Sequence, residues 1–374
     1  MTGRDGRSAD GDLGGSGGPE GPATPGGAGN RAALGGAGGL TRSGVSGASA
    51  APLRVVAFGG GHGLSASLRA LRLLRDRWSR EPGGRALEIT AVVTVGDDGG
   101  SSGRLRAERG GLPPGDLRQA LVALAEVDHP AGGLSAALFQ HRFDGDGYLS
   151  GHAVGNLVLL GLMEMLGDPV AALDHVAGML GCCGRVLPMS REAVSIEADV
   201  LGGDPGRPGE VVAVRGQHAV AVTRGEVRTV RLRPERPAAC AEVLAAVDAA
   251  DWLIFGPGSW YTSVIPHLLV PDLAAAVAAS PARRLVTLNL AAEKETLGLS
   301  VPDHLAALTR YLPALRFDVV LADGKAVGDP EPVHRAAESL GARLALAPVA
   351  VSDGSPRHDP AALAAALEAV LGPP

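Results

Sequence analysis

The chain contains few aromatic residues, few cysteines and almost no lysine. Aromatic side chains make up 3% of its 374 residues, and Lys294 and Lys325 are the only lysines, so arginine carries nearly all of the positive charge. We attach no function to this bias of composition. The formal net charge of -6 excludes a broad electrostatic attraction to DNA, RNA or anionic lipid. A local basic pocket for phosphate remains compatible with it.

The sequence also lacks a disulfide framework and a membrane anchor. Its three cysteines, Cys182, Cys183 and Cys240, have neither disulfide nor zinc spacing, and we interpret the adjacent pair as small core residues. No apolar run reaches the roughly 18–20 residues of a membrane span. The N-terminus shows no secretory signal. We therefore expect a cytoplasmic protein with no membrane span.

Residues 1–51 consist mainly of Gly, Ala, Ser, Pro and Asp with scattered Arg. Such a segment cannot bury enough apolar surface to offset the entropy lost on ordering. We predict a disordered low-complexity tail here and assign residues 52–374 to the folded domain. The acids and arginines of the tail roughly balance, which argues against an arm that binds nucleic acid.

Short apolar runs alternate with helical patterns through most of the remaining chain. Strands are predicted at 53–58, 89–95, 252–255, 284–289, 317–321 and 343–347, and helices at 64–77, 117–127, 153–166, 302–311 and 360–371. This alternation predicts an α/β fold with a mostly parallel sheet covered on both faces. Residues 184–233 break the pattern with short β-like segments, which predict a small antiparallel β insert.

The first strand ends in a glycine-rich turn. Gly60, Gly61, His62 and Gly63 lead directly into a helix, and Gly61-x-Gly63-x-x-Ala66 fits a dinucleotide-binding pattern. Glycines let backbone N–H groups approach a phosphate, and the start of a helix adds partial positive charge. A tight turn that needs only glycine flexibility is the alternative.

The second strand ends in an acidic, serine-rich turn. Asp97 and Asp98 stand where a ribose-binding carboxylate is expected, and they are also candidates to bind Mg²⁺. Ser101, Ser102 and Arg104 offer hydrogen-bond donors for phosphate. The alternative is a polar turn without a ligand.

Two further glycine-containing turns precede helices. Asp116 is placed as a helix N-cap, and Arg118 is the better ligand candidate of that turn. His152 and Asn156 are four residues apart, so a helix would present both on one face. For these two turns, capping and packing remain the alternatives to ligand binding.

A last glycine turn follows the strand at 252–255. Gly258 and Ser259 belong to this turn, and Trp260 and Tyr261 come next. The two aromatic side chains either stack on a base or sugar or fasten the helix to the core. Asn289, at the end of the following strand, is a further polar candidate. Because ligands of parallel sheets lie beyond the carboxyl ends of the strands, these turns together predict one phosphate-binding edge.

These motifs, taken in order, resemble the CofD family and, within it, the branch of the bacterial gluconeogenesis factors. The resemblance spans residues 53–311. It is carried by the stretches GGGHGLS, TVGDDGGSSGRLR, PPGDLRQAL, GHAVGNL and GPGSWYTSVIPHLLVP.

The resemblance implies a three-layer Rossmann-like fold, a cytoplasmic location, and a role in cell shape and growth on gluconeogenic carbon sources. It implies a UDP-sugar ligand, notably UDP-N-acetylglucosamine, and control of peptidoglycan-precursor supply without an established reaction. CofD itself transfers a phospholactyl group from a nucleotide donor to a deazaflavin with a divalent metal. The residues that match family contacts are Gly60, Gly61, His62, Gly63, Asp97, Asp98, Asn156, Gly258 and Ser259.

The chain departs from the family pattern at three places. Trp260 replaces a usual leucine, and His267 replaces a common asparagine. The stretch 289–296 lacks the usual Gln-Pro-Gly before Glu-Thr, which puts binding of the same sugar at this edge in question.

Three functions are compatible with these residues. We favour a regulator that binds a UDP-sugar and signals to an unidentified protein partner. A CofD-like phosphotransferase, with Asp97 or Asp98 positioning Mg²⁺, is the alternative. A nicotinamide-dependent oxidoreductase rests on the first turn alone and is the weakest. The oligomeric state is left open, a homo-oligomer included.

Overall fold

A computed structural model describes residues 51–127, 130–296 and 299–372 of the chain. The predicted low-complexity tail at 1–51 therefore lies, apart from its last residue, outside the described residues. Everything described belongs to one unit of the chain.

Seven strands form one sheet in which every neighbouring pair is parallel. The strand order is β10-β9-β8-β7-β1-β2-β3. The strands are β1 (Leu53–Gly59), β2 (Leu87–Val93), β3 (Arg185–Pro188), β7 (Trp252–Phe255), β8 (Arg283–Thr287), β9 (Val319–Ala322) and β10 (Arg343–Leu346). The six strands predicted from the apolar runs are all present.

The central strands are buried along nearly their whole length, as expected for a parallel sheet with helices on both faces. Aromatic rings join neighbouring strands through the core. Phe58 of β1 is in register with Phe255 of β7, and their rings stack with centroids 4.8 Å apart. Phe317 meets Phe255 edge to face at 5.7 Å. These three phenylalanines thus pack together at the middle of the sheet.

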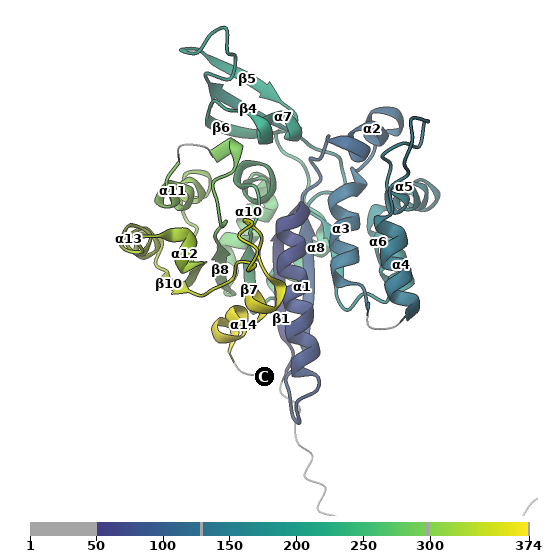
Figure 1. The fold of residues 1–374 in the computed structure, drawn as a ribbon, viewed down its shortest axis with the longest axis horizontal. Coiled ribbons are helices and arrows are strands. Elements are labelled where there is room, and N and C mark those ends of the chain that lie inside the picture. Colours follow the sequence, from purple (N-terminus) through teal and green to yellow (C-terminus); the bar gives the residue numbers. More distant parts are fainter. Residues whose placement is uncertain (1–50, 128–129, 297–298, 373–374) are drawn as a thin grey trace, which may run out of the picture. The chain divides into compact units, whose positions relative to one another are not determined.

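Helices cover both faces of this sheet. In Figure 1, α1, α3 and α14 lie in front of the strands, and the fainter α8 and α10 lie behind them. Helix α1 packs against both α3 and α14, and α8 packs against α10. The larger helices are α1 (Gly61–Trp78), α2 (Gly100–Arg109), α3 (Pro114–Leu124), α4 (Pro130–Gln140), α5 (Val154–Leu166), α6 (Pro169–Leu180), α8 (Ala241–Asp248), α10 (Pro271–Ala279), α11 (Val301–Tyr311), α13 (Glu331–Ser339) and α14 (Pro360–Leu371).

Five short helical segments complete the fold. They are α7 (Gln217–Val222), the π-helix η1 (Trp260–Val264), α9 (Ile265–Leu268), the 3-10 helix η2 (Lys294–Thr296) and α12 (Gly324–Val327). Together the layers confirm the predicted α/β fold with a mostly parallel sheet.

A separate three-stranded antiparallel sheet forms the small insert. Its order is β5-β4-β6, with β4 (Ser195–Leu201), β5 (Val211–Arg215) and β6 (Glu226–Arg233). The insert was predicted to begin at 184, but Arg185–Pro188 pairs with β2 in the main sheet. Four residues are too few for the apolar pattern to distinguish the two environments. Figure 1 shows the insert, with α7, above one end of the main sheet.

The acidic turn after β2 also differs from expectation, because residues 100–109 form helix α2. Three glycines among residues 99–103 masked the helical pattern in the sequence, since glycine has low helix propensity.

Among the described residues, no single helix is long and apolar enough to cross a membrane. One pair, Trp260–Leu268 with Pro271–Ala279, reaches that length and composition only in combination, across a bend of 76°.

Candidate functional site

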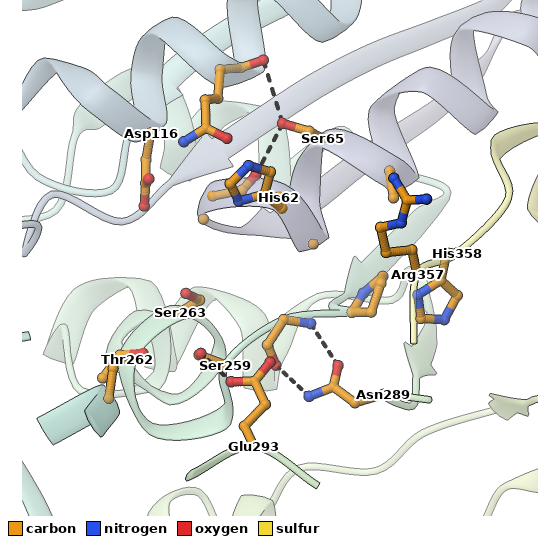
Figure 2. Close-up of a pocket in the computed structure, with 18 of the residues that line it drawn as sticks. His62, Ser65, Asp116, Ser259, Thr262, Ser263, Asn289, Glu293, Arg357 and His358 are labelled. Carbon is orange, nitrogen blue, oxygen red and sulfur yellow. Dashed lines mark hydrogen bonds between the residues drawn. The ribbon is translucent and has the colours of Figure 1, made fainter. Parts of the chain in front are cut away.

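A cleft of about 1040 Å³ opens beyond the carboxyl ends of the central strands. The chain places β2 and β3 on one side of β1 and β7 to β10 on the other, so the strand order reverses between β1 and β7. Ligands of open parallel sheets bind at such a reversal. In Figure 2, His62, Ser65 and Asp116 form one wall of the cleft, and Ser259, Thr262, Ser263, Asn289 and Glu293 form the facing wall.

The turn after β1 requires glycine at Gly60 and Gly61. A Cβ on Gly60 would lie 2.5 Å from Thr94 Oγ1 and 2.6 Å from Asp116 Oδ2. Gly61 has a φ of +54°, which favours glycine. Helix α1 starts at this turn and has no acidic residue in its first turn. The start of α1 and its helix dipole therefore suit an anion such as phosphate.

The turn after β7 is held in place by Asn289. The backbone N–H of Gly258 donates to Asn289 Oδ1 at 2.8 Å, and Asn289 Nδ2 donates back to the Gly258 carbonyl at 3.0 Å. The hydroxyl of Ser259 donates to the carboxylate of Glu293. Asn289 and Glu293 thus fix the backbone and the hydroxyl that this turn presents to the cleft.

Two carboxyl groups, Asp97 and Asp116, line the cleft beside the first turn. Burial, and secondarily the nearby Asp97 charge, raises the pKa of Asp116 to about 7, although the N–H of Gly61 donates to this carboxyl. Burial likewise raises the pKa of Asp97 above its usual range. Burial thus disfavours the charged form of both carboxyl groups, and a nearby cation would favour it.

Arg118 brings positive charge to the same wall. Its Nε donates to Asn156 Oδ1 at 2.9 Å, and its Nη1 donates to the side chain of Gln140 and to the Phe139 carbonyl. Burial lowers the pKa of Arg118 to about 10, which leaves it charged at neutral pH. Arg69, Arg142 and Arg357 also line the cleft, so a polyanionic ligand finds several cations here.

The last wall comes from the loop before α14. Val351, Pro356, Arg357, His358 and Pro360 line the cleft, and Figure 2 shows Arg357 and His358 at its side. Arg357 is held by Asp353, with Nη2 to Oδ2 at 2.6 Å. No glycine motif marks this loop, so the sequence did not suggest it.

The structure divides the predicted site residues into two groups. Those that line the cleft are Gly60, Gly61, His62, Gly63, Asp97, Gly258 and Ser259. They come from turns far apart in the sequence and share one cavity.

The other predicted residues do not line the cleft. Asn156 holds Arg118 and donates to Ser101 Oγ at 3.0 Å, while Ser101 Oγ lies 2.9 Å from His152 Nδ1. Arg104 Nη2 donates to the Ser150 carbonyl at 2.5 Å.

Ser102 and Asp98 complete that second group. The hydroxyl of Ser102 donates to Asp97, and Asp98 Oδ1 accepts the backbone N–H of His218 at 2.8 Å. Of the predicted metal pair, Asp97 lines the cleft and Asp98 does not; Asp116 and Glu293 are the other carboxyl groups of the lining. Asp116, interpreted from sequence as an N-cap, is the third residue of α3, whose N-cap is Pro113.

The departures from the family pattern fall into two kinds. Trp260 is 2% exposed and His267 is fully buried, and burial lowers the pKa of His267 to about 4. These two side chains serve packing rather than the cleft. The altered stretch 289–296, in contrast, supplies Asn289, Ala291 and Glu293 to the cleft lining.

The carboxyl groups of the cleft fit Mg²⁺ together with a phosphate of the ligand. Proteins hold this ion through one or two carboxylates together with phosphate oxygens of the ligand. Asp97 and Asp116 supply two carboxyl groups, and no cluster of three or more His, Cys, Asp or Glu suited to a metal occurs in the described part of the chain. The ion would therefore be held jointly with a phosphate.

Known proteins share both the sequence and the fold. The family of 2-phospho-L-lactate transferase CofD matches residues 55–344. A Mycobacterium tuberculosis protein is 50% identical over 320 residues, 84% of this chain and 90% of its own. Gluconeogenesis factor from Halalkalibacterium halodurans is 38% identical over 276 residues, 74% of this chain and 79% of that protein. Gluconeogenesis factor from Bacillus subtilis is 35% identical over 291 residues, which are 78% of this chain and 84% of that protein.

A crystal structure of a UPF0052 family member from Bacillus halodurans superposes with a TM-score of 0.72 at 34% identity, covering 85% of this chain and 99% of that one. The fold, the glycine turns and the relatives agree: the chain belongs to the CofD family and is similar to its members named gluconeogenesis factor.

Proposed function

We propose that this protein binds a UDP-sugar of the UDP-N-acetylglucosamine type in the cleft between β1 and β7 and acts as a regulator. The observation that carries the proposal is the contact between the two glycine turns. A Cβ on Gly63 would lie 2.2 Å from the Pro257 carbonyl oxygen, so the two turns pack directly against each other, and Gly63, Pro257 and Gly258 line the same cavity. Backbone amides at the start of a helix bind phosphate.

The size and charge of the cleft favour a ligand with several parts. Its volume of about 1040 Å³ lies at the upper end of the range for small-molecule sites. Cationic Arg69, Arg118 and Arg142 suit a diphosphate. The amide and hydroxyl groups of Asn289 and Ser259, on the facing wall, suit a sugar or a base.

The regulatory role is supported by the relatives. Two of them are named gluconeogenesis factor, which denotes a process rather than a reaction. We propose the same cellular setting for this chain: a cytoplasmic protein that supports cell shape, growth on gluconeogenic carbon and peptidoglycan-precursor supply through a protein partner. A deletion strain that grows normally on such carbon sources and keeps its shape would contradict this role.

A thermal-shift screen tests the ligand class directly. We expect UDP-N-acetylglucosamine to raise the melting temperature, because a ligand that binds only the folded state stabilises it. GDP, NAD and a deazaflavin serve as comparisons, each with and without Mg²⁺. A shift with NAD and none with UDP-sugars would refute the proposal.

A CofD-like transferase is the second candidate, and the Asp97–Asp116 pair favours it. These two carboxyl groups would hold Mg²⁺, which would neutralise charge on a transferred phosphoryl group. The glycine turns would hold the donor phosphates, and Arg118 would orient them. Release of a nucleoside phosphate from a nucleotide donor, in a reaction that requires a deazaflavin acceptor, would identify this activity. Tight UDP-sugar binding without turnover would favour the regulator.

A further inference from the structure

Asp98 belongs to the acidic motif after β2, yet it points at helix α7 of the insert rather than into the cleft. Its Oδ1 accepts the backbone N–H of His218 at 2.8 Å, across 120 residues of sequence. Gly216, the residue before α7, has a φ of +97°, and a Cβ there would lie 2.1 Å from Asp98 Oδ2. The carboxylate therefore fits closely against bare backbone at the start of this helix.

Helix α7 is the part of the insert that reaches the cleft. Gln217, His218 and Ala221 all line the cavity. Gln217 Nε2 donates to the Thr262 carbonyl at 3.2 Å, which ties α7 to the wall formed by η1. Six residues are too few for a helix to be stable alone, so the position of α7 depends on its tertiary contacts, which include β4 and β5 of the insert as well as η1 and η2.

The docked helix also brings an imidazole to the carboxyl pair. A Cβ on Gly99 would lie 3.7 Å from His218 Nδ1 and 3.4 Å from Asp97 Oδ1. The imidazole ring of His218 and the carboxylate of Asp97 thus flank the same glycine, Gly99. His218 and Gln217 offer hydrogen-bond groups that suit phosphate oxygens and sugar hydroxyls.

We propose that Asp98 is a positioning residue that docks α7 onto the cleft, so that Gln217 and His218 complete the binding site for the polar ligand. The identity of the ligand as a nucleotide sugar rests on the proposed function, whereas the docking of α7 does not. The carboxylate of Asp98 acts through a helix of the insert and not by touching metal or ligand.

Two substitutions separate docking from metal binding. Asp98→Asn keeps a side-chain oxygen that accepts the His218 N–H, whereas Asp98→Ala removes it. If Asp98 docks α7, Asp98→Asn should largely preserve the docking of α7 and the affinity for ligand, whereas Asp98→Ala should weaken both. A metal ligand predicts that both substitutions weaken the dependence on Mg²⁺, because a neutral amide oxygen is a poorer ligand for this ion than a carboxylate.

Hydrogen exchange of the full-length protein without ligand measures docking directly. In Asp98→Ala we expect the backbone amides of Gln217–Val222 to exchange about tenfold faster or more, as for the loss of a hydrogen bond to a charged group. Asp98→Asn should stay within a few-fold of wild type. Asp204→Ala, on the turn between β4 and β5, is the matched control in the same insert and should leave α7 unchanged.

The second measurement is the affinity for UDP-N-acetylglucosamine by calorimetry. We expect Asp98→Ala to raise the Kd about tenfold, with Asp98→Asn and Asp204→Ala close to wild type. If wild type does not bind this ligand, the proposed function fails, while the exchange data still decide the docking of α7.

A second substitution disturbs the same contact from the side of α7. Gly216→Ala places a methyl group against the Asp98 carboxylate and also strains the backbone at a φ of +97°, so it should speed exchange in α7 at least as much as Asp98→Ala does, with circular dichroism unchanged. The proposal would be overturned if hydrogen exchange in α7 were unaltered in both Asp98→Ala and Gly216→Ala. It would also be overturned if Asp98→Asn and Asp98→Ala equally reduced the Mg²⁺ dependence of the affinity for UDP-N-acetylglucosamine.

Discussion

Gly63 of helix α1 and Pro257 of the turn after β7 approach so closely that a Cβ on Gly63 would lie 2.2 Å from the Pro257 carbonyl oxygen and 2.7 Å from Gly258 Cα. Neighbouring strands thus bring two glycine turns into contact at the point where the strand order reverses. Both the packing of α1 on the sheet and the shape of the cleft depend on this contact.

Gly63→Ala is expected to lower the free energy of unfolding by about 1–3 kcal/mol, because the methyl group meets backbone that cannot move aside. Gly161→Ala in α5 is the matched control, since a Cβ there meets no atom within 4 Å. That change should be neutral or stabilise the helix by up to about 1 kcal/mol. Chemical denaturation of the two variants measures both effects, and equal stabilities would contradict the contact.

Arg118 and Asn156 are expected to act as a unit in ligand binding. Arg118→Ala should weaken UDP-sugar binding about 10- to 100-fold, because a charged hydrogen-bond donor is lost. Asn156→Ala should weaken it less, since the arginine stays but loses the acceptor of its Nε. Arg109→Ala is the control: Arg109 pairs with Glu164 on the surface, and its loss should leave the affinity unchanged. Equal affinities of all variants would show that Arg118 does not contribute to ligand binding.

The pKa of Asp116, raised to about 7 in the folded protein, makes stability depend on pH. Between about pH 4 and pH 7 the folded form holds a proton that the unfolded chain has lost, so stability decreases as the pH rises through this window. The contribution of one group is at most about 1.4 kcal/mol per pH unit. Asp116→Asn should flatten this slope in urea titrations at a series of pH values. Parallel curves for variant and wild type would show that Asp116 ionises normally.

The cysteines are expected to be unreactive in the folded protein. Burial raises the pKa of Cys182 to about 12 and raises the pKa of Cys183 and of Cys240. Because the thiolate is the reactive form, an aromatic disulfide reagent at pH 8 should label native protein slowly and all three thiols rapidly after denaturation. Fast labelling of the native protein would contradict this environment.

The strands and the glycine turns were predictable from sequence because both are local. A run such as 252–255 is apolar throughout, and parallel strands all end at one edge, so Gly61, Asp98 and Ser259 were expected in a common cleft. Gly61 and Ser259 line the cleft together with Asp97, whereas Asp98 does not line it.

The residues that sequence reasoning missed depend on tertiary contacts. Asp116 has the pattern of a cap, and only its burial beside Asp97 marks it as part of the site. Arg357 and His358 come from a loop without a motif. In the sequence, Asp98 looked equivalent to Asp97, because the contact between Asp98 and α7 joins residues that are 120 positions apart.

Calorimetry with UDP-N-acetylglucosamine measures whether a nucleotide sugar binds in the cleft, with its phosphates at the turn that opens α1. We expect saturable binding to one site per chain, weakened by Arg118→Ala and unaffected by Arg109→Ala. An absence of binding to wild type, or an affinity that Arg118→Ala leaves unchanged, would contradict a nucleotide-sugar site in this cleft.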